Sequence, residues 1–154
     1  MGLLTYSLAF RGEATPDGDG LVVRASAPSC TLETRVAKDG VSSRQLFDEG
    51  VEEAILEALL AFRNDGSFTA STTIDFGHGH RLFIETLDEG RLDGSADENL
   101  RHGTAVFRVS GGTGQFRGAT GQVTSNFVLS DTGELTDNQL GMVFLRPEVL
   151  ARGS

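Results

Sequence analysis

The sequence predicts an all-β domain, a closed antiparallel calycin-like barrel of about eight strands with at most one short helix. Three observations predict it. Short runs of β-branched and aromatic residues recur along the chain, turn signals separate them, and 20 of the 154 residues are glycine. Because 154 residues is the length of one domain, residues 1–154 are expected to form a single barrel.

The first three strands are expected at residues 3–10, 21–25 and 31–36. The first of them leads into the turn-rich stretch 15–20, which contains Pro16 and two Asp-Gly pairs. The third alternates apolar and polar residues and ends at Lys38-Asp39-Gly40.

Residues 51–62 are ambiguous between helix and strand. Val51, Ile55, Leu59 and Phe62 have helical spacing, and the segment contains several good helix formers. However, Asn64-Asp65-Gly66 is a strong hairpin turn signal, and residues 67–76 are rich in β-branched and aromatic residues. The sequence therefore favours a β-hairpin here.

The second half of the chain reads as further strands joined by loops. Strands are expected at residues 80–86, 102–109, 122–129 and 139–145. The polar segment from Asp88 to Asn99 is expected to be a long loop at the barrel rim, where functional residues often lie.

The most distinctive stretch is the glycine-rich segment 111–121, Gly-Gly-Thr-Gly-Gln-Phe-Arg-Gly-Ala-Thr-Gly. It is not a dinucleotide fingerprint, because Arg117 stands where the third glycine is required and a β-like run follows. Its glycines instead favour a tight barrel corner with Phe116 inserted into the core.

With its flanking strands, this segment resembles the G-G-T-G-x-F-x-x-A-x-G motif of the allene oxide cyclase and dirigent barrel superfamily. The resemblance covers roughly the last third of the chain. It implies an eight-stranded barrel with an apolar cavity, in which members bind hydrophobic small molecules and some direct cyclisation or radical coupling. It also implies a homodimer or homotrimer. No catalytic residue of the plant cyclases matches a position here.

Strand alternation supplies the candidate ligand-binding residues. Ser125 shares a face with Val123, Phe127 and Leu129, which is the expected core face, so Asn126 points outward unless a bulge reverses the parity. The predicted ligand-binding set is Phe83, Phe107, Phe116, Ser125, Asn126 and Phe127.

His102 and Glu85 are the candidate catalytic residues. His102 enters a strand next to the long loop, where an imidazole can act as a general acid or base near neutral pH. The alternative for His102 is a hydrogen bond that holds the loop, without chemistry. Glu85 faces opposite His80 on a regular strand, so both cannot enter one cavity without a bulge.

The order His78-x-His80, Glu85 and His102 is similar to the ligand order of a metal-dependent cupin. The glycine and proline positions of the second cupin motif are absent, and the interval from Glu85 to His102 is short. No metal and no other cofactor are therefore predicted, and a cupin-like enzyme stays an alternative.

Composition and charge bear on which partners the protein binds and in which compartment it is found. A net charge of −9 argues against nucleic acid, whose phosphates such a surface repels. Met1 to Tyr6 lack a secretory signal, no apolar run could span a membrane as a helix, and the single Cys30 suits a reducing compartment, so a cytoplasmic protein is expected.

Together these observations predict a barrel that binds an apolar small molecule, with a cofactor-free cyclase or isomerase as the expected activity. Two alternatives stay open. One is a non-catalytic binding or oligomerisation module with a solid barrel, and the other is the metal-dependent cupin-like enzyme.

Overall fold

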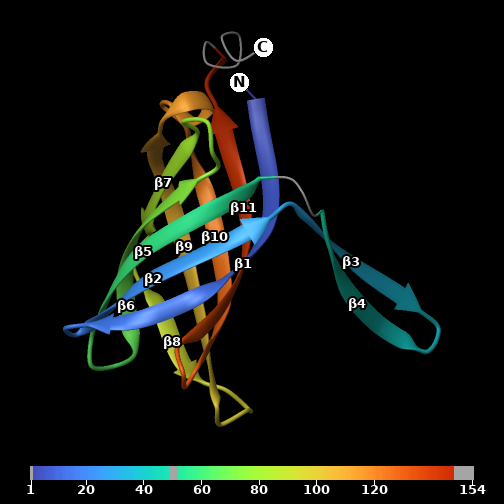
Figure 1. The fold of residues 1–154 in the computed structure, drawn as a ribbon, viewed down its shortest axis with the longest axis vertical. Helices are drawn as coiled ribbons and strands as arrows, with labels where there is room; N and C mark the ends of the chain where they lie inside the picture. Colours follow the sequence, from blue (N-terminus) through green and yellow to red (C-terminus); the bar gives the residue numbers. More distant parts are fainter. Residues whose placement is uncertain (1, 49–51, 148–154) are drawn as a thin grey trace.

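The computed structural model describes residues 2–48 and 52–147, and eight of its strands close into an antiparallel barrel (Figure 1). In order around the barrel these are β1 (Gly2–Asp17), β2 (Gly20–Pro28), β5 (Glu53–Phe62), β6 (Ser67–Asp75), β7 (Arg81–Thr86), β9 (Leu100–Gly112), β10 (Thr120–Ser130) and β11 (Glu134–Leu145). Pairing of β11 with β1 closes the ring, which confirms the predicted fold class. The described part of the chain has no helix long and apolar enough to cross a membrane.

The hairpin of β1 and β2 is longer than the sequence indicates. β1 continues to Asp17, whereas alternation in the sequence ends the strand near residue 10. The turn-forming residues join the strand because Thr15 pairs with Val22 and Asp17 with Gly20, so only Gly18 and Asp19 remain as the loop. Gly18 adopts a φ of +61°, which favours glycine at that position.

The ambiguous segment forms the predicted hairpin of β5 and β6. Its inward residues Ala54, Leu56 and Ala58 are buried while Leu59 is exposed, a period of two that excludes the helix. The turn is stabilised by Asp65, whose Oδ1 accepts hydrogen bonds from the Ser67 backbone N–H (3.0 Å) and hydroxyl (2.6 Å). Val51, where the predicted element begins, lies outside the described residues.

The prediction of a continuous loop from Asp88 to Asn99 is wrong in part, because the segment contains β8 (Gly90–Gly94). β8 pairs with β9 and, through Gly90 and Arg91, with β6. Leu92 is buried, and an added Cβ at Gly90 would lie 2.3 Å from the ring of Phe68. The strand forms through these distant partners, which a polar five-residue sequence does not reveal.

The glycine-rich segment lies at one end of the barrel, and Phe116 is in the core as predicted. The segment forms the short 3-10 helix η1 (Gly114–Phe116), the orange turn at the upper end in Figure 1, and buries the Phe116 ring. Phe116 packs on Phe76 with ring centroids 5.3 Å apart, and Phe76 packs edge-on against Tyr6 at 5.8 Å. Aromatic rings therefore seal this end.

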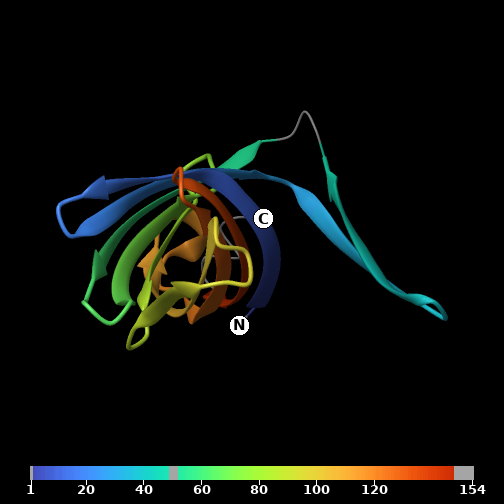
Figure 2. The same ribbon diagram turned by 90° about the horizontal axis from the view of Figure 1, so that it is seen from below.

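The remaining two strands leave the barrel. β3 (Cys30–Ala37) and β4 (Gly40–Phe47) pair only with each other and project sideways as a separate hairpin, here called the arm (Figure 2). The sequence predicts β3 but gives no indication of β4. At the base of the arm, the guanidinium of Arg11 on β1 lies 5.1 Å from the ring centroid of Phe47.

Candidate functional site

The barrel interior contains a small cavity of about 30 Å³. It lies in the part of the barrel away from Phe116, and its lining comes from inward-facing residues of six barrel strands. The lining is mostly apolar: Val23, Leu56, Ala58, Leu60, Phe68, Ala70, Thr72, Phe107, Ser125, Phe127, Leu135, Asp137 and Gln139. A cavity of this volume has space for about two water molecules.

Asp137 is the one carboxylate among these lining residues. It projects inward from β11 because Leu135, Asp137 and Gln139 alternate on the inner face of that strand. Its Oδ1 accepts a hydrogen bond from the Ser125 hydroxyl at 2.6 Å, and its Oδ2 accepts one from Gln139 Nε2 at 2.9 Å. All three side chains are buried, so the carboxyl group is held in one orientation.

Tyr6 extends this polar cluster toward the closed end. Its hydroxyl donates a hydrogen bond to Gln139 Oε1 at 3.2 Å. Its ring lies against Gly141, where an added Cβ would be 2.0 Å from a ring carbon. Gly141 is therefore needed for Tyr6 to point at Gln139.

Burial changes the acidity of the two titratable groups of the cluster. Burial raises the pKa of Asp137 from an ordinary 3.8 to about 6, against the hydrogen bonds from Ser125 and Gln139, which lower it. Burial, and then the nearby Asp137 charge, raise the pKa of the Tyr6 hydroxyl, so it stays protonated. The cluster thus combines a carboxyl group that titrates near neutrality with a permanent hydrogen-bond donor.

Three of the predicted ligand-binding residues line this cavity. Phe107, Ser125 and Phe127 all face inward, with Ser125 on the core face of its strand as alternation predicts. Phe116 is also buried, but it seals the barrel end and does not line the cavity. Gly103 makes room for Phe127, since an added Cβ there would lie 2.0 Å from the phenyl ring.

The other predicted site residues lie on the outside of the barrel. His102 and Asn126 are exposed, and His102 Nε2 donates to Asn126 Oδ1 at 2.5 Å across β9 and β10. Glu85 faces outward from β7 and is paired with Arg108. Because alternate residues of a strand point to opposite faces, neither His102 nor Glu85 reaches the interior next to Asp137.

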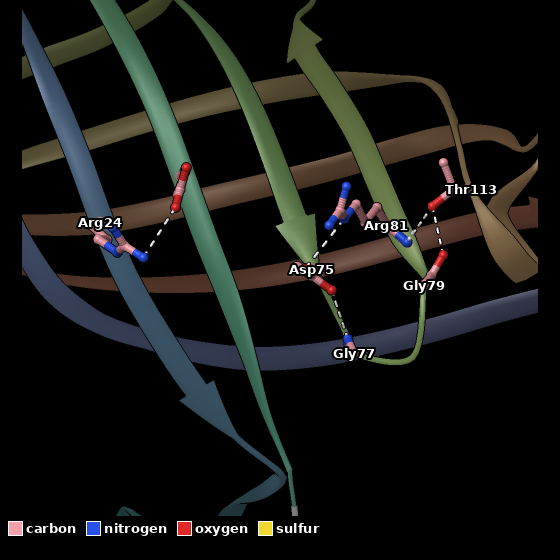
Figure 3. A network of polar contacts seen from close by, with 7 residues as sticks. Arg24, Asp75, Gly77, Gly79, Arg81 and Thr113 are labelled. Atoms are coloured by element: carbon pink, nitrogen blue, oxygen red, sulfur yellow. Dashed lines mark hydrogen bonds and ion pairs between the residues drawn. The ribbon is translucent and has the colours of Figure 1, made fainter.

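Phe83 borders a groove of about 530 Å³ on the outer wall, over β2, β5, β6 and β7. The charged groups of this groove are paired with one another: Arg24 with Glu57 at 3.4 Å, and Arg81 with Asp75 at 3.3 Å (Figure 3). Asp75 also accepts a hydrogen bond from the Gly77 backbone N–H, the main cause of its lowered pKa. The contacts of Asp75 with Arg81 and Gly77 hold the β6–β7 turn in place.

The three histidines do not converge. His78 pairs with Glu52, His80 Nδ1 accepts a hydrogen bond from the Gln115 backbone N–H at 3.0 Å, and His102 pairs with Asn126. Among the described residues no group of three or more histidine, cysteine, aspartate or glutamate side chains is placed to hold a metal ion.

Sequence reasoning found Ser125 but missed Asp137 and Gln139, for a specific reason. The last strand is predicted to begin at Gln139, but β11 begins at Glu134, so Asp137 falls in what reads as a turn. Alternation along the strand could have revealed the cluster, because Asp137 and Gln139 share a face with the apolar residues Val143 and Leu145. Two polar residues on such a face indicate an interior polar site.

Comparisons with known proteins do not assign the chain to a group. No protein-family model, curated protein or solved structure matches it. The similarity of residues 111–121 to the allene oxide cyclase and dirigent barrel superfamily therefore stays a prediction from the sequence.

Proposed function

We propose that this chain binds a small apolar metabolite inside its barrel and acts on it as a cofactor-free isomerase or cyclase. In this proposal Asp137 is the group that accepts a proton from the substrate and returns it at another atom. The observation that carries the proposal is the buried Asp137 carboxyl group, hydrogen-bonded by Ser125 and Gln139 in an otherwise apolar cavity.

The acidity of Asp137 suits this role. With a pKa of about 6, both its protonated and ionised forms are accessible near neutral pH, which is the condition for efficient general acid and base catalysis. Returning the proton leaves the substrate isomerised and needs no oxidant or reductant. Gln139 donates a hydrogen bond that holds the carboxyl group, and Tyr6 in turn donates one that holds Gln139.

Burying an ionised carboxylate has a free-energy cost, and the pKa of Asp137, raised by burial, reflects that cost. Both oxygens of the carboxyl group accept hydrogen bonds, from Ser125 and from Gln139, and an amide in this arrangement could accept only one of the two. Ionisable groups with perturbed pKa values in an interior cavity are candidates for function on this ground.

The cavity is much smaller than ordinary ligand sites, which occupy about 300–1,000 Å³. Binding therefore requires the interior to widen. Leu60 is the half-buried member of the lining and lies on β5 near the end opposite η1. We place the entrance there.

The sequence supports the setting of this activity. The glycine-rich segment resembles that of barrels that enclose hydrophobic molecules, and the single Cys30 fits a cytoplasmic protein. The substrate class we propose is accordingly a small, uncharged, largely apolar metabolite.

The test is retention of a small molecule by the folded protein. The wild type is incubated with an apolar extract of its host's cells, and native mass spectra are compared before and after denaturation. Ala70→Leu fills the cavity, and Ser71→Leu adds the same side chain to the outer face of the same strand. We expect the wild type and Ser71→Leu to retain an added mass and Ala70→Leu to lose it. Failure of the wild type to retain any molecule, or equal retention by a folded Ala70→Leu protein, would overturn the proposal.

A further inference from the structure

Thr72 contributes a hydroxyl group to the barrel interior. Alternation along β6 turns Thr72 inward and Thr73 outward, and Thr72 is only 4% exposed. It lines the same cavity as Asp137. A hydroxyl group buried among apolar residues is ordinarily paired, because leaving its hydrogen-bonding capacity unused costs free energy.

The Thr72 hydroxyl has no hydrogen-bond partner among the described residues. The other polar side chains of the cavity lining bond to one another, since the Ser125 hydroxyl and Gln139 Nε2 both donate to Asp137. No fully buried side-chain nitrogen or oxygen in the described part of the chain lacks a partner. Because the Thr72 oxygen has none, it is open to the space of the cavity that Thr72 lines.

Thr72 and Asp137 come from opposite walls of the barrel. In the order around the ring, β6 and β11 are separated by three strands on each side: β1, β2 and β5 on one, and β7, β9 and β10 on the other. Both residues line one cavity. A molecule held there lies between a hydroxyl group that is free to donate a hydrogen bond and a carboxyl group that can accept a proton.

This arrangement suits a substrate that carries a carbonyl group. A C–H bond next to a carbonyl group is acidic for an uncharged molecule, because the electron pair left behind is delocalised onto the carbonyl oxygen. A hydroxyl donor stabilises that oxygen as its charge develops, while a carboxylate on the opposite side accepts the proton. An apolar molecule without an acceptor atom would leave the Thr72 hydroxyl unpaired in the closed interior.

We propose that the Thr72 hydroxyl holds the carbonyl oxygen of the substrate, and that the substrate class is a small uncharged ketone. The Asp137 carboxylate takes a proton from the carbon next to the carbonyl group. The electron pair of that C–H bond forms an enolate, whose oxygen accepts the Thr72 hydrogen bond. The protonated carboxyl group then returns the proton to a carbon of the same molecule, so no other reactant is consumed. The inference rests on the proposed function, because it assigns a substrate to the same cavity.

Binding of two matched ligands tests the assignment of Thr72. Cyclopentanone and methylenecyclopentane share one ring, but a CH2 group replaces the carbonyl oxygen in the second. Thr72→Val removes the hydroxyl group at nearly constant volume, Thr72→Ser retains it, and Thr73→Val makes the first change on the outer face of the strand. In NMR titrations, Thr72→Val should weaken binding of cyclopentanone about tenfold relative to methylenecyclopentane. Thr72→Ser and Thr73→Val should keep the wild-type ratio of the two dissociation constants.

Thermal unfolding separates a lost contact with the ligand from a lost fold. Because the Thr72 hydroxyl has no partner within the described residues, Thr72→Val should unfold at the wild-type temperature or above it. A lowered affinity for cyclopentanone in this variant then reports on the ligand.

Deuterium exchange distinguishes this inference from the proposed function. In D2O, the wild type should speed incorporation of deuterium next to the carbonyl group of cyclopentanone, Asp137→Asn should abolish this activity, and Thr72→Val should lower it about 100-fold. An affinity ratio unchanged by Thr72→Val would overturn the assignment of Thr72, even where Asp137→Asn abolishes exchange and the proposed function stands. Binding of cyclopentanone that depends on Thr72, without exchange, would support the assignment of Thr72 and overturn the catalytic role of Asp137. If neither ligand binds, both proposals fail.

Discussion

The barrel and the arm are built from the same kind of hairpin but bury their apolar residues differently. On β6, the inward residues Phe68, Ala70 and Ile74 are buried because neighbouring strands curve around them. On β3, Leu32, Thr34 and Val36 alternate in the same way and remain exposed. Alternation gives a strand two faces, but only closure of the sheet decides which face is covered.

The barrel and the arm are therefore suited to different roles. Closure of the barrel removes its edges and creates an interior in which the acidity of one carboxyl group changes. The arm keeps free edges, which suit contact with another chain, and encloses no interior. The chemistry and the ligand recognition that we propose are accordingly both inside the barrel.

The largest expected effect is the contrast between equivalent phenylalanine truncations in the two regions. Phe68→Ala empties a buried site next to Phe62 and Phe127, and should lower the free energy of unfolding by about 3–5 kcal/mol. Phe47→Ala on the arm removes a half-exposed ring and its contact with Arg11, and should cost about 1 kcal/mol. Urea denaturation of both variants, at concentrations where the chain is monomeric, measures the difference. Equal losses would mean that the arm is part of the barrel's cooperative core.

The second effect is a pH dependence that originates inside the barrel. Below its ordinary pKa of 3.8, Asp137 is protonated in both the folded and the unfolded chain. Between 3.8 and about 6 the unfolded chain releases this proton while the folded chain keeps it, so the stability contribution is lost as pH rises. At about 1.4 kcal/mol for each pKa unit, the loss is about 3 kcal/mol, and it is complete above pH 6.

Asp137→Asn isolates this contribution, because the amide does not titrate. Subtracting the free energy of unfolding of the variant from that of the wild type at each pH should give a curve that falls between about pH 4 and pH 6 and is level above it. Asp75→Asn, on the outer surface, is the control. Its carboxyl pKa is lowered, so its difference curve should have the opposite slope. A flat curve for Asp137→Asn would show that the carboxyl group is solvated.

Local signals in the sequence predict much of the barrel. Asn64-Asp65-Gly66 places the β5–β6 turn, alternation places Ser125 inside and Asn126 outside, and the glycine-rich segment places Phe116 in the core. Each of these inferences uses residues that are close in sequence. The physical cause, a turn conformation or the two faces of a strand, acts over the same short range.

What the sequence does not reveal depends on partners far along the chain. β8 is a strand because β9 and β6 pair with it, and Asp137 is interior because β11 starts before the strand signal does. Likewise Gly103 is needed only because Phe127 lies across from it on β10. His102 and Glu85 have suitable chemistry, but parity and pairing place them outside the barrel.

The smallest expected effect is that of replacing His102 and Glu85, which lie on the outside of the barrel. It tests whether the ligand site is inside the barrel or on its outer surface. His102→Gln and Glu85→Gln alter exposed side chains whose partners, Asn126 and Arg108, are also exposed. Each should change the free energy of unfolding by no more than about 0.5–1 kcal/mol, because exposed polar pairs contribute little. Retention of a cellular metabolite, measured by native mass spectrometry, should also be unchanged in both variants. Ser125→Val is the contrasting variant, next to Asn126 in the sequence but facing inward. It should weaken retention, because Asp137 loses the hydrogen bond that the Ser125 hydroxyl donates. Loss of retention on replacing His102, with Ser125→Val unaffected, would move the ligand site from the interior to the outer surface of β9 and β10.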